Sequence, residues 1–162
     1  MFREMRRFKQ LLSQEETINI LNACTSGVLG VHGDNGYPYT VPLSYVYKER
    51  KLYFHCAFEG HKIDSIKRND KVTFTVIEQD DVIQEGFKTH YRSVIIFGRA
   101  RILTDAAEKQ YALKCIVEKY SPDYIDKGNM VIEDALSNVC IMEVNIEHMT
   151  GKAAMDIVNN NK

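Results

Sequence analysis

The sequence predicts a mainly β protein, in which six antiparallel strands form a closed or nearly closed small barrel with short flanking helices. Six segments have the alternating or β-branched pattern of strands, and turn residues separate several of them. Helical patterns occur between only some of these segments, which favours an antiparallel barrel. The 162 residues contain no repeat and no linker, so we expect one domain with its core at about 13–150. Side chains fill a barrel of this size, so a ligand is expected at its rim or between subunits.

The first half of the chain begins with a helix and a β-hairpin. Ser13 and Glu16 form a capping box ahead of a short helix at 17–23. Residues 33–36 (GDNG) are a strong hairpin signal. The strands of this half are expected at 27–32, 39–47 and 52–57.

The second half alternates strands with helices. A short amphipathic helix is expected at 60–69, a longer one at 106–120 after the capping residue Asp105, and a helical turn at 130–137. Residues 79–90 have no regular pattern and are expected to be irregular. The strands of this half are expected at 71–78, 92–103 and 139–147. The centre of the second of these, VIIF at 94–97, is apolar on both faces, so one face is expected to meet a helix or a second subunit.

Charge and composition argue against several classes of protein. The formal net charge is −1 and the basic residues are spread along the chain, unlike the basic face of a duplex-DNA-binding protein. No apolar run approaches the roughly 18 residues of a membrane span. The basic residues 1–12 lack the apolar core of a secretory signal and are interpreted as an N-terminal arm, and a short tail is expected after residue 150. The four cysteines have no CxxC spacing, which argues against a metal site or disulfide framework and favours the cytoplasm.

Four motifs in order resemble those of one protein family. They are YTVPLSYVY at 39–47, LYFHCA at 52–57, GHKID at 60–64 and YRSVIIFG at 91–98. Together with MRR at 5–7 and MTGK at 149–152, they are similar to the pyridoxamine 5′-phosphate oxidase-like flavoproteins, in particular the branch related to nitroimidazole-resistance proteins. The resemblance implies a split barrel, a symmetric homodimer, and two FMN molecules at the dimer interface. It does not imply vitamin B6 synthesis, because the second strand lacks the Arg-led stretch of the true oxidase.

A phosphate site is predicted where the third strand gives way to a helix. The backbone N–H groups and dipole of a helix N-terminus favour a phosphate. Gly60 allows close approach of the backbone, while His61 and Lys62 bring side-chain donors. The alternative is an ordinary surface helix with a solvated Lys62.

The second strand is predicted to lie along the flavin ring. Pro42 has no N–H for a neighbouring strand and belongs at an edge or an irregularity, which leaves nearby backbone groups free to bond the ring. The residues concerned are Val41, Pro42, Leu43 and Ser44. The alternative is an edge strand with one exposed serine.

Tyr53 and His55 share one face of the third strand and are predicted to contact the cofactor. Histidine can give or take a proton near neutral pH, so His55 is the candidate catalytic residue. The alternatives for His55 are a hydrogen bond to the ring or packing alone.

Further cofactor contacts are predicted across the dimer interface. Tyr91, Arg92 and Ser93 open the long strand, although Arg92 also suits a surface ion pair. Lys152 resembles a family position near the FMN of the partner subunit, and a solvated lysine is the alternative.

The function expected from these features is an FMN-dependent oxidoreductase that acts on a small molecule. The flavin carries electrons from a reduced donor to an acceptor, and the nearest branch of the family suggests a nitroaromatic acceptor. Two alternatives remain at this point. One is a non-catalytic flavin-binding or flavin-sensing protein, and the other is a haem-handling split barrel with His55 or His148 as iron ligand.

Overall fold

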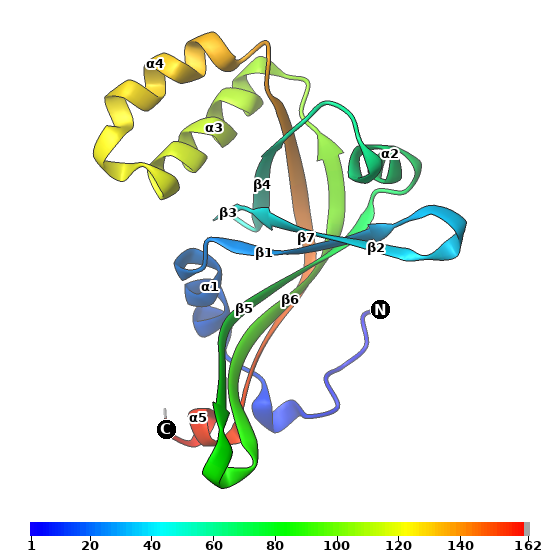
Figure 1. Cartoon of the computed structure of the whole chain (residues 1–162), viewed down its shortest axis with the longest axis vertical. Coiled ribbons are helices and arrows are strands. Elements are labelled where there is room, and N and C mark those ends of the chain that lie inside the picture. Colours follow the sequence, from blue (N-terminus) through cyan, green and yellow to red (C-terminus); the bar gives the residue numbers. More distant parts are fainter. Residues whose placement is uncertain (161–162) are drawn as a thin grey trace.

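The computed structural model describes residues 1–160 and shows one antiparallel sheet with helices packed on it (Figure 1). The strands are β1 (Ser26–His32), β2 (Pro38–Ser44), β3 (Val46–Lys48), β4 (Lys51–Cys56), β5 (Lys71–Ile83), β6 (Lys88–Ile102) and β7 (Cys140–Ala153). The helices are α1 (Gln14–Ala23), α2 (His61–Arg68), α3 (Ala106–Tyr120), α4 (Ile125–Ala135) and α5 (Met155–Asn160). No helix within residues 1–160 is long and apolar enough to cross a membrane.

The sheet has seven strands in the order β2-β1-β5-β6-β7-β4-β3, so the predicted number of six was wrong. The single strand predicted at 39–47 is interrupted at Tyr45 and becomes β2 and β3, which lie at opposite edges of the sheet. Hydrogen bonds do not close the barrel. Because Tyr45 alone joins the two edge strands, and consecutive Cα atoms are about 3.8 Å apart, the sheet must curl until its edges meet. The sequence carries no sign of this break, since neither Gly nor a polar turn marks it.

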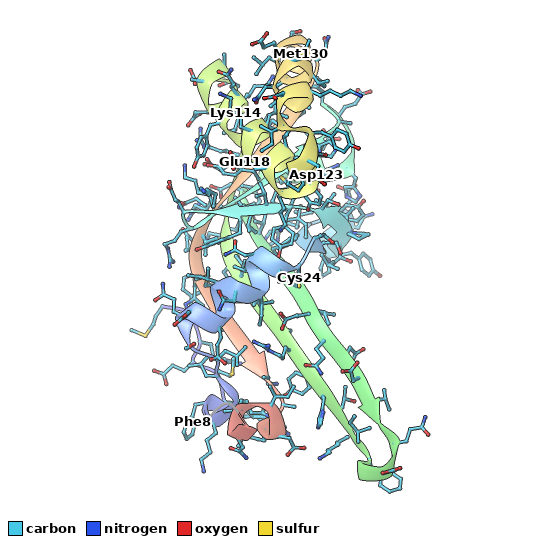
Figure 2. The ribbon with its side chains drawn as sticks, turned by 90° about the vertical axis from the view of Figure 1, so that its left-hand side faces the viewer. Phe8, Cys24, Lys114, Glu118, Asp123 and Met130 are labelled. Carbon is cyan, nitrogen blue, oxygen red and sulfur yellow. The ribbon has the colours of Figure 1, made fainter. Side chains whose placement is uncertain are left out.

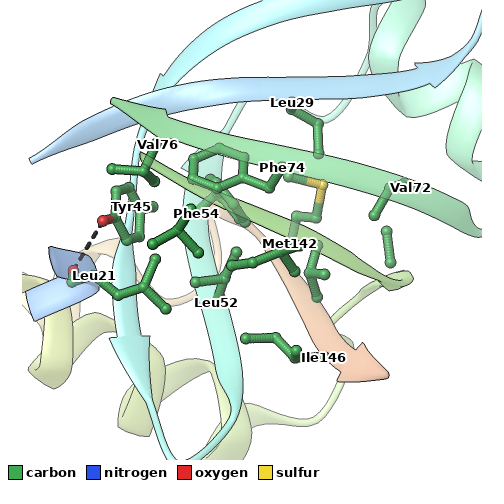
Figure 3. Close-up of a cluster of buried hydrophobic side chains, with 14 of the residues drawn as sticks. Leu21, Leu29, Tyr45, Leu52, Phe54, Val72, Phe74, Val76, Met142 and Ile146 are labelled. Carbon is green, nitrogen blue, oxygen red and sulfur yellow. Dashed lines mark hydrogen bonds between the residues drawn. The ribbon is translucent and has the colours of Figure 1, made fainter. Parts of the chain in front are cut away.

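A core of aliphatic and aromatic side chains fills the curled sheet (Figure 3). The Phe74 ring packs edge-on against Tyr45 and Phe54, with centroid distances of 5.0 and 5.2 Å. Leu29 and Met142 complete the packing from β1 and β7. The alternation predicted for β5 is confirmed, because Val72, Phe74 and Val76 are all buried in this core.

A second, smaller core lies on the other face of the sheet, beneath α3 and α4. Tyr53 of β4 and Ile141 of β7 pack there against Ala112, Leu113 and Ile132. The bounds predicted for α3 are confirmed, as is the Asp105 cap, whose side chain accepts a hydrogen bond from the Glu108 N–H. The helical turn predicted at 130–137 is a longer helix, α4. Its sequence lacks an N-cap signal, which explains why its beginning was not predicted.

The capping box predicted ahead of α1 is confirmed. The Ser13 side chain accepts from the Glu16 N–H, and the Glu16 carboxylate accepts from the Ser13 N–H. The predicted helix α2 and the hairpin between β1 and β2 are also present.

The segment predicted to be irregular, 79–90, is regular. After a bulge between Ile77 and Gln79, β5 and β6 stay paired as far as Ile83 and Lys88. We call residues 79–91 the hairpin extension; its tip lies at the opposite end of the molecule from α3 and α4 (Figure 1). Most of its side chains are exposed, so neither face imposes the alternation from which a strand is recognised.

Both ends of the chain are attached to β7. Leu11 forms a bridge with Lys152, and the Leu12 N–H donates to the Gly151 carbonyl. Beyond residue 150, where a tail was expected, β7 continues to Ala153 and α5 follows. Residues 161–162 of that expected tail lie outside the described residues.

Candidate functional site

A pocket of about 250 Å³ brings together three of the predicted site residues, Ser44, Tyr53 and His55. It lies where the end of β2, strand β4 and the C-terminal half of α3 meet. Its other lining residues are Tyr45, Ile116 and Tyr120. The α3 residues were not predicted, because the sequence predicts α3 but gives no sign of which strand its last turns cover.

The strand β4 directs its side chains by simple alternation. Leu52 and Phe54 point into the barrel core, while Tyr53 and His55 point toward α3. His55 is exposed at the pocket and Tyr53 is buried behind it. Burial, and then the nearby Glu143 carboxylate, raises the pKa of Tyr53 well above its usual range, so its hydroxyl stays protonated.

The Glu143 carboxylate behind Tyr53 is buried and held by two cations. Lys51 Nζ lies 2.9 Å and Arg101 Nε 2.8 Å from its oxygens. Burial alone would raise the pKa of Glu143, but hydrogen bonds from Arg101 and Lys51 outweigh it and hold the pKa below its usual range. This carboxylate is therefore ionised and held in place behind Tyr53, with its charge balanced by Lys51 and Arg101.

The start of α2 presents a helix N-terminus without a side-chain cap. Gly60 has φ 121°, which few other residues adopt, and a Cβ at this position would meet no atom within 4 Å. Lys62 lies close enough to the Cys56 thiol to act on its pKa, although burial and then Cys140 raise that pKa to about 12. The uncapped helix start at Gly60, together with the Lys62 cation, thus fits a phosphate.

His61 is directed away from that N-terminus. Its ring stacks on Tyr39 at 4.1 Å, and its Nε2 lies 3.3 Å from Asp34 in the β1–β2 turn. Arg68 also contacts Asp34, at 2.6 Å. The hydrogen bond from Arg68 lowers the pKa of Asp34. In this structure His61 therefore attaches α2 to the hairpin.

The edge position predicted for Pro42 is confirmed, since β2 has a neighbouring strand only on its β1 side. Val41 and Leu43 turn toward the barrel core, whereas Pro42 and Ser44 are exposed. Only Ser44 of these four lines the pocket described above.

The remaining predicted residues gather at the base of the hairpin extension. Ser93 pairs with Lys152, whose Nζ lies 5.2 Å from the centroid of the Tyr91 ring. The Tyr91 hydroxyl donates to Gln10 Oε1 at 3.3 Å. Arg92 Nε lies 3.2 Å from Glu78, which is the ion pair considered as the alternative for this residue.

The predicted residues at the pocket and those at the base of the hairpin extension therefore form two separate groups within one chain. His55 is paired with Ile141 and Ser93 with Lys152, eleven residues further along β7. At about 3.3 Å per residue, the two groups are roughly 36 Å apart along the strand.

An apolar surface lies on the outside of the sheet, across β1, β5 and β6. Val94 and Ile96 fill the core, while the alternate residues Ile95 and Phe97 are 43% and 37% exposed. Val28 and Ile77 extend this surface onto the neighbouring strands. The prediction of two apolar faces at 94–97 is confirmed.

His148, the other histidine considered as a haem ligand, lies beside this surface. Its ring stacks on Phe2 at 4.8 Å. Among the side chains that the structure describes, which exclude those of residues 134 and 160–162, no group of three or more His, Cys, Asp or Glu could hold a metal ion.

The chain matches one protein-family model. The model is that of pyridoxamine 5′-phosphate oxidase, and it matches residues 13–153. Among curated proteins no sequence matches the chain.

Several solved structures are similar to the chain. A candidate 5-nitroimidazole antibiotic resistance protein from Bacteroides thetaiotaomicron is 28% identical, with a TM-score of 0.76 over 88% of this chain and 86% of that one. A FAD-binding protein from Mesorhizobium loti is 25% identical, with a TM-score of 0.62 over 89% of this chain and 96% of that one. The flavocytochrome Anf3 from Azotobacter vinelandii is 21% identical and shares the fold, with a TM-score of 0.78 over 93% of this chain and 72% of that one.

Proposed function

Because the chain belongs to the pyridoxamine 5′-phosphate oxidase family, we propose that it is a homodimeric FMN-dependent oxidoreductase. In this proposal a bound flavin carries electrons from a reduced donor to a small acceptor. The FAD-binding relative supports a flavin, and the candidate nitroimidazole-resistance relative supports a nitroaromatic acceptor. The start of α2, which has no side-chain cap and carries Gly60 and Lys62, supports a phosphate-bearing cofactor, and FMN carries one phosphate.

The observation that carries the proposal is the pocket at Ser44 and His55, close to the start of α2. Four residues lie between His55 and Gly60, so their Cα atoms, five steps apart along the chain, are at most about 18 Å apart. A ligand with a phosphate at one end and a flat ring at the other suits this arrangement. The pocket offers the ring a hydroxyl, an imidazole and aromatic walls.

When bound, FMN would supply the electron-transfer chemistry, and the side chains would bind and orient it. Lys62 would hold the phosphate by charge, and the Ser44 hydroxyl would bond the edge of the ring. His55 would hold or release a proton at a ring nitrogen beside the acceptor. Ile116 and the tyrosine rings would restrict water over the ring.

The separation of the two residue groups supports the dimer. One chain does not bring Tyr91, Ser93 and Lys152 to the pocket of its own His55, whereas a partner chain can. The exposed apolar residues on β1, β5 and β6 also require a cover, and a two-fold dimer covers the same surface on both subunits.

The test is the visible spectrum and the sedimentation of the purified protein. We expect flavin absorption bands, up to one FMN per chain, and a dimer. A flavin-loaded monomer would contradict an interfacial site, and a haem spectrum would replace the proposal by a haem-handling role. Bound flavin that no nicotinamide donor reduces, or that no acceptor reoxidises, would indicate a non-catalytic flavin protein.

A further inference from the structure

The Tyr120 hydroxyl, at the end of α3, occupies the break between the two edge strands. It accepts a hydrogen bond from the Tyr45 N–H at 2.9 Å. It also lies 2.7 Å from the Tyr45 carbonyl and 2.5 Å from the Thr25 carbonyl, and it donates its one proton to these acceptors. Both backbone groups of Tyr45 therefore meet the same hydroxyl.

At the break between β2 and β3, the Tyr120 hydroxyl takes the place of a neighbouring strand as hydrogen-bond partner of the backbone. Buried backbone groups need a partner, and a strand normally supplies it. Tyr45 belongs to neither β2 nor β3, and its N–H lies a long 3.4 Å from the Thr25 carbonyl. The Tyr120 hydroxyl thus fixes the peptide that follows Ser44.

Lys119, the residue before Tyr120, contacts both the Tyr45 ring and the end of α1. Its Nζ donates to the Cys24 carbonyl at 2.6 Å and lies 4.2 Å from the centroid of the Tyr45 ring. The Tyr45 hydroxyl in turn donates to the Leu21 carbonyl at 2.8 Å. Figure 2 views this side of the molecule, with Cys24 at the end of α1 and Glu118 on the last turns of α3.

Tyr120 differs from Lys119 in one respect, because it also lines the pocket. With Ile116, it forms the α3 wall opposite Ser44 and His55. One side chain therefore contacts the pocket and fixes the backbone next to a predicted ring-binding residue.

We propose that Tyr120 is a positioning residue of the flavin site, whose hydroxyl holds the Ser44–Tyr45 backbone in the geometry that binds the flavin ring. This inference rests on the proposed function, since it requires that the pocket binds flavin. It assigns Tyr120 to the ring end of the cofactor. The phosphate end, at Lys62, is independent of it.

The experiment compares Tyr120→Phe with Tyr124→Phe in the flavin-free dimer. Tyr120 is 37% exposed and the variant keeps its ring, so it is expected to fold. Tyr124 is 66% exposed and does not line the pocket. The affinities for FMN and riboflavin are measured by flavin fluorescence, and stability by thermal unfolding without flavin. We expect Tyr120→Phe to weaken both flavins by about ten-fold, as for the loss of one hydrogen bond, and Tyr124→Phe to weaken neither.

The comparison of FMN with riboflavin separates a positioning role of Tyr120 from a purely structural role and from a contact with the phosphate. A merely structural Tyr120 would lower the melting temperature and leave both affinities unchanged, which would overturn the inference while the proposed function stands. Weakening of FMN alone would also overturn it, because that would place Tyr120 at the phosphate. A wild-type protein that binds neither flavin would overturn the proposed function and this inference with it.

Discussion

The two halves of the β5–β6 hairpin have the same backbone pairing and very different burial. In the barrel half, Val72, Phe74 and Val76 of β5 face Val94 and Ile96 of β6 in a closed core. In the hairpin extension, beyond the bulge, Val82 is 70% and Phe87 98% exposed. The ladder of hydrogen bonds is continuous, but the hydrophobic stabilisation ends at the bulge.

The hairpin extension is attached by polar contacts that run from beside its tip to its base. Lys88 and His90 pair with Asp156 of α5, and Tyr91 bonds Gln10 of the N-terminal segment. Regions with few buried apolar contacts open at low free energy, so the extension can adjust without unfolding the barrel. The two groups of candidate site residues divide along the same line: one is built into the helix-covered barrel, and the other stands at the base of the extension.

The largest expected effect tests this difference in burial. Phe74→Ala removes a ring from the centre of the core and should lower the free energy of unfolding by about 3–5 kcal/mol. Phe87→Ala, at the tip of the extension, should change it by less than about 0.5 kcal/mol. Urea unfolding of both variants measures the difference. Equal losses would mean that the tip is buried in solution, against a partner subunit for example.

The next effect concerns carboxylates in the two regions. Glu143→Gln leaves Lys51 and Arg101 without their buried partner and should cost about 2–3 kcal/mol at pH 7. Asp156→Asn, at an exposed ion pair, should cost less. Since hydrogen bonds hold the pKa of Glu143 below its usual range, its contribution is present above about pH 4.3 and is lost as the pH falls through the lowered pKa. Unfolding curves of wild type and Glu143→Gln should therefore converge in acid; a gap that widens with falling pH would contradict this assignment.

At the barrel end of the site, Lys62→Ala should weaken FMN much more than riboflavin. A charge-assisted contact to phosphate contributes about 1.5–3 kcal/mol, so the loss for FMN should be roughly ten- to hundred-fold. Lys67→Ala, in the last turn of the same helix, is the control and should leave both affinities unchanged. Equal weakening of both ligands by Lys62→Ala would show that Lys62 acts through folding or the ring.

The smallest effect distinguishes chemistry from packing at His55. His55→Gln keeps a hydrogen-bonding side chain of similar reach, so the dimer and much of the FMN binding should persist. Turnover per bound flavin should fall by about ten-fold or more if His55 moves a proton. Loss of flavin and turnover together, with a normal rate per bound FMN, would assign His55 to packing.

The parts of the fold that the sequence predicts are those with a local chemical signature. The capping box at Ser13, the Asp105 cap and the alternation around Phe74 each depend on residues close in sequence, and each is confirmed. The break at Tyr45 and the strand pairing of 79–90 have no such signature. The first depends on α3 and α1, which lie far away in the chain, and the second on backbone pairing between exposed side chains.

The candidate site divides in the same way. Motif resemblance was enough to single out Ser44, Tyr53 and His55, which the structure brings into one pocket. It could not reveal Tyr120, because only the packing of α3 on β4 places that ring opposite His55. Their roles toward a cofactor stay predictions.

The strand order has a consequence for how the chain is made. β7 lies between β6 and β4. Cys56 of β4 pairs with Cys140 of β7, which is 84 residues further along the chain. During synthesis, β4 and β6 therefore leave the ribosome before β7. Each has one edge without a neighbouring strand until β7 pairs between them. Such non-local pairing slows folding, and an unpaired edge is open to aggregation. Premature termination before residue 140 would leave two sets of strands, β2-β1-β5-β6 and β4-β3, without the strand that joins them.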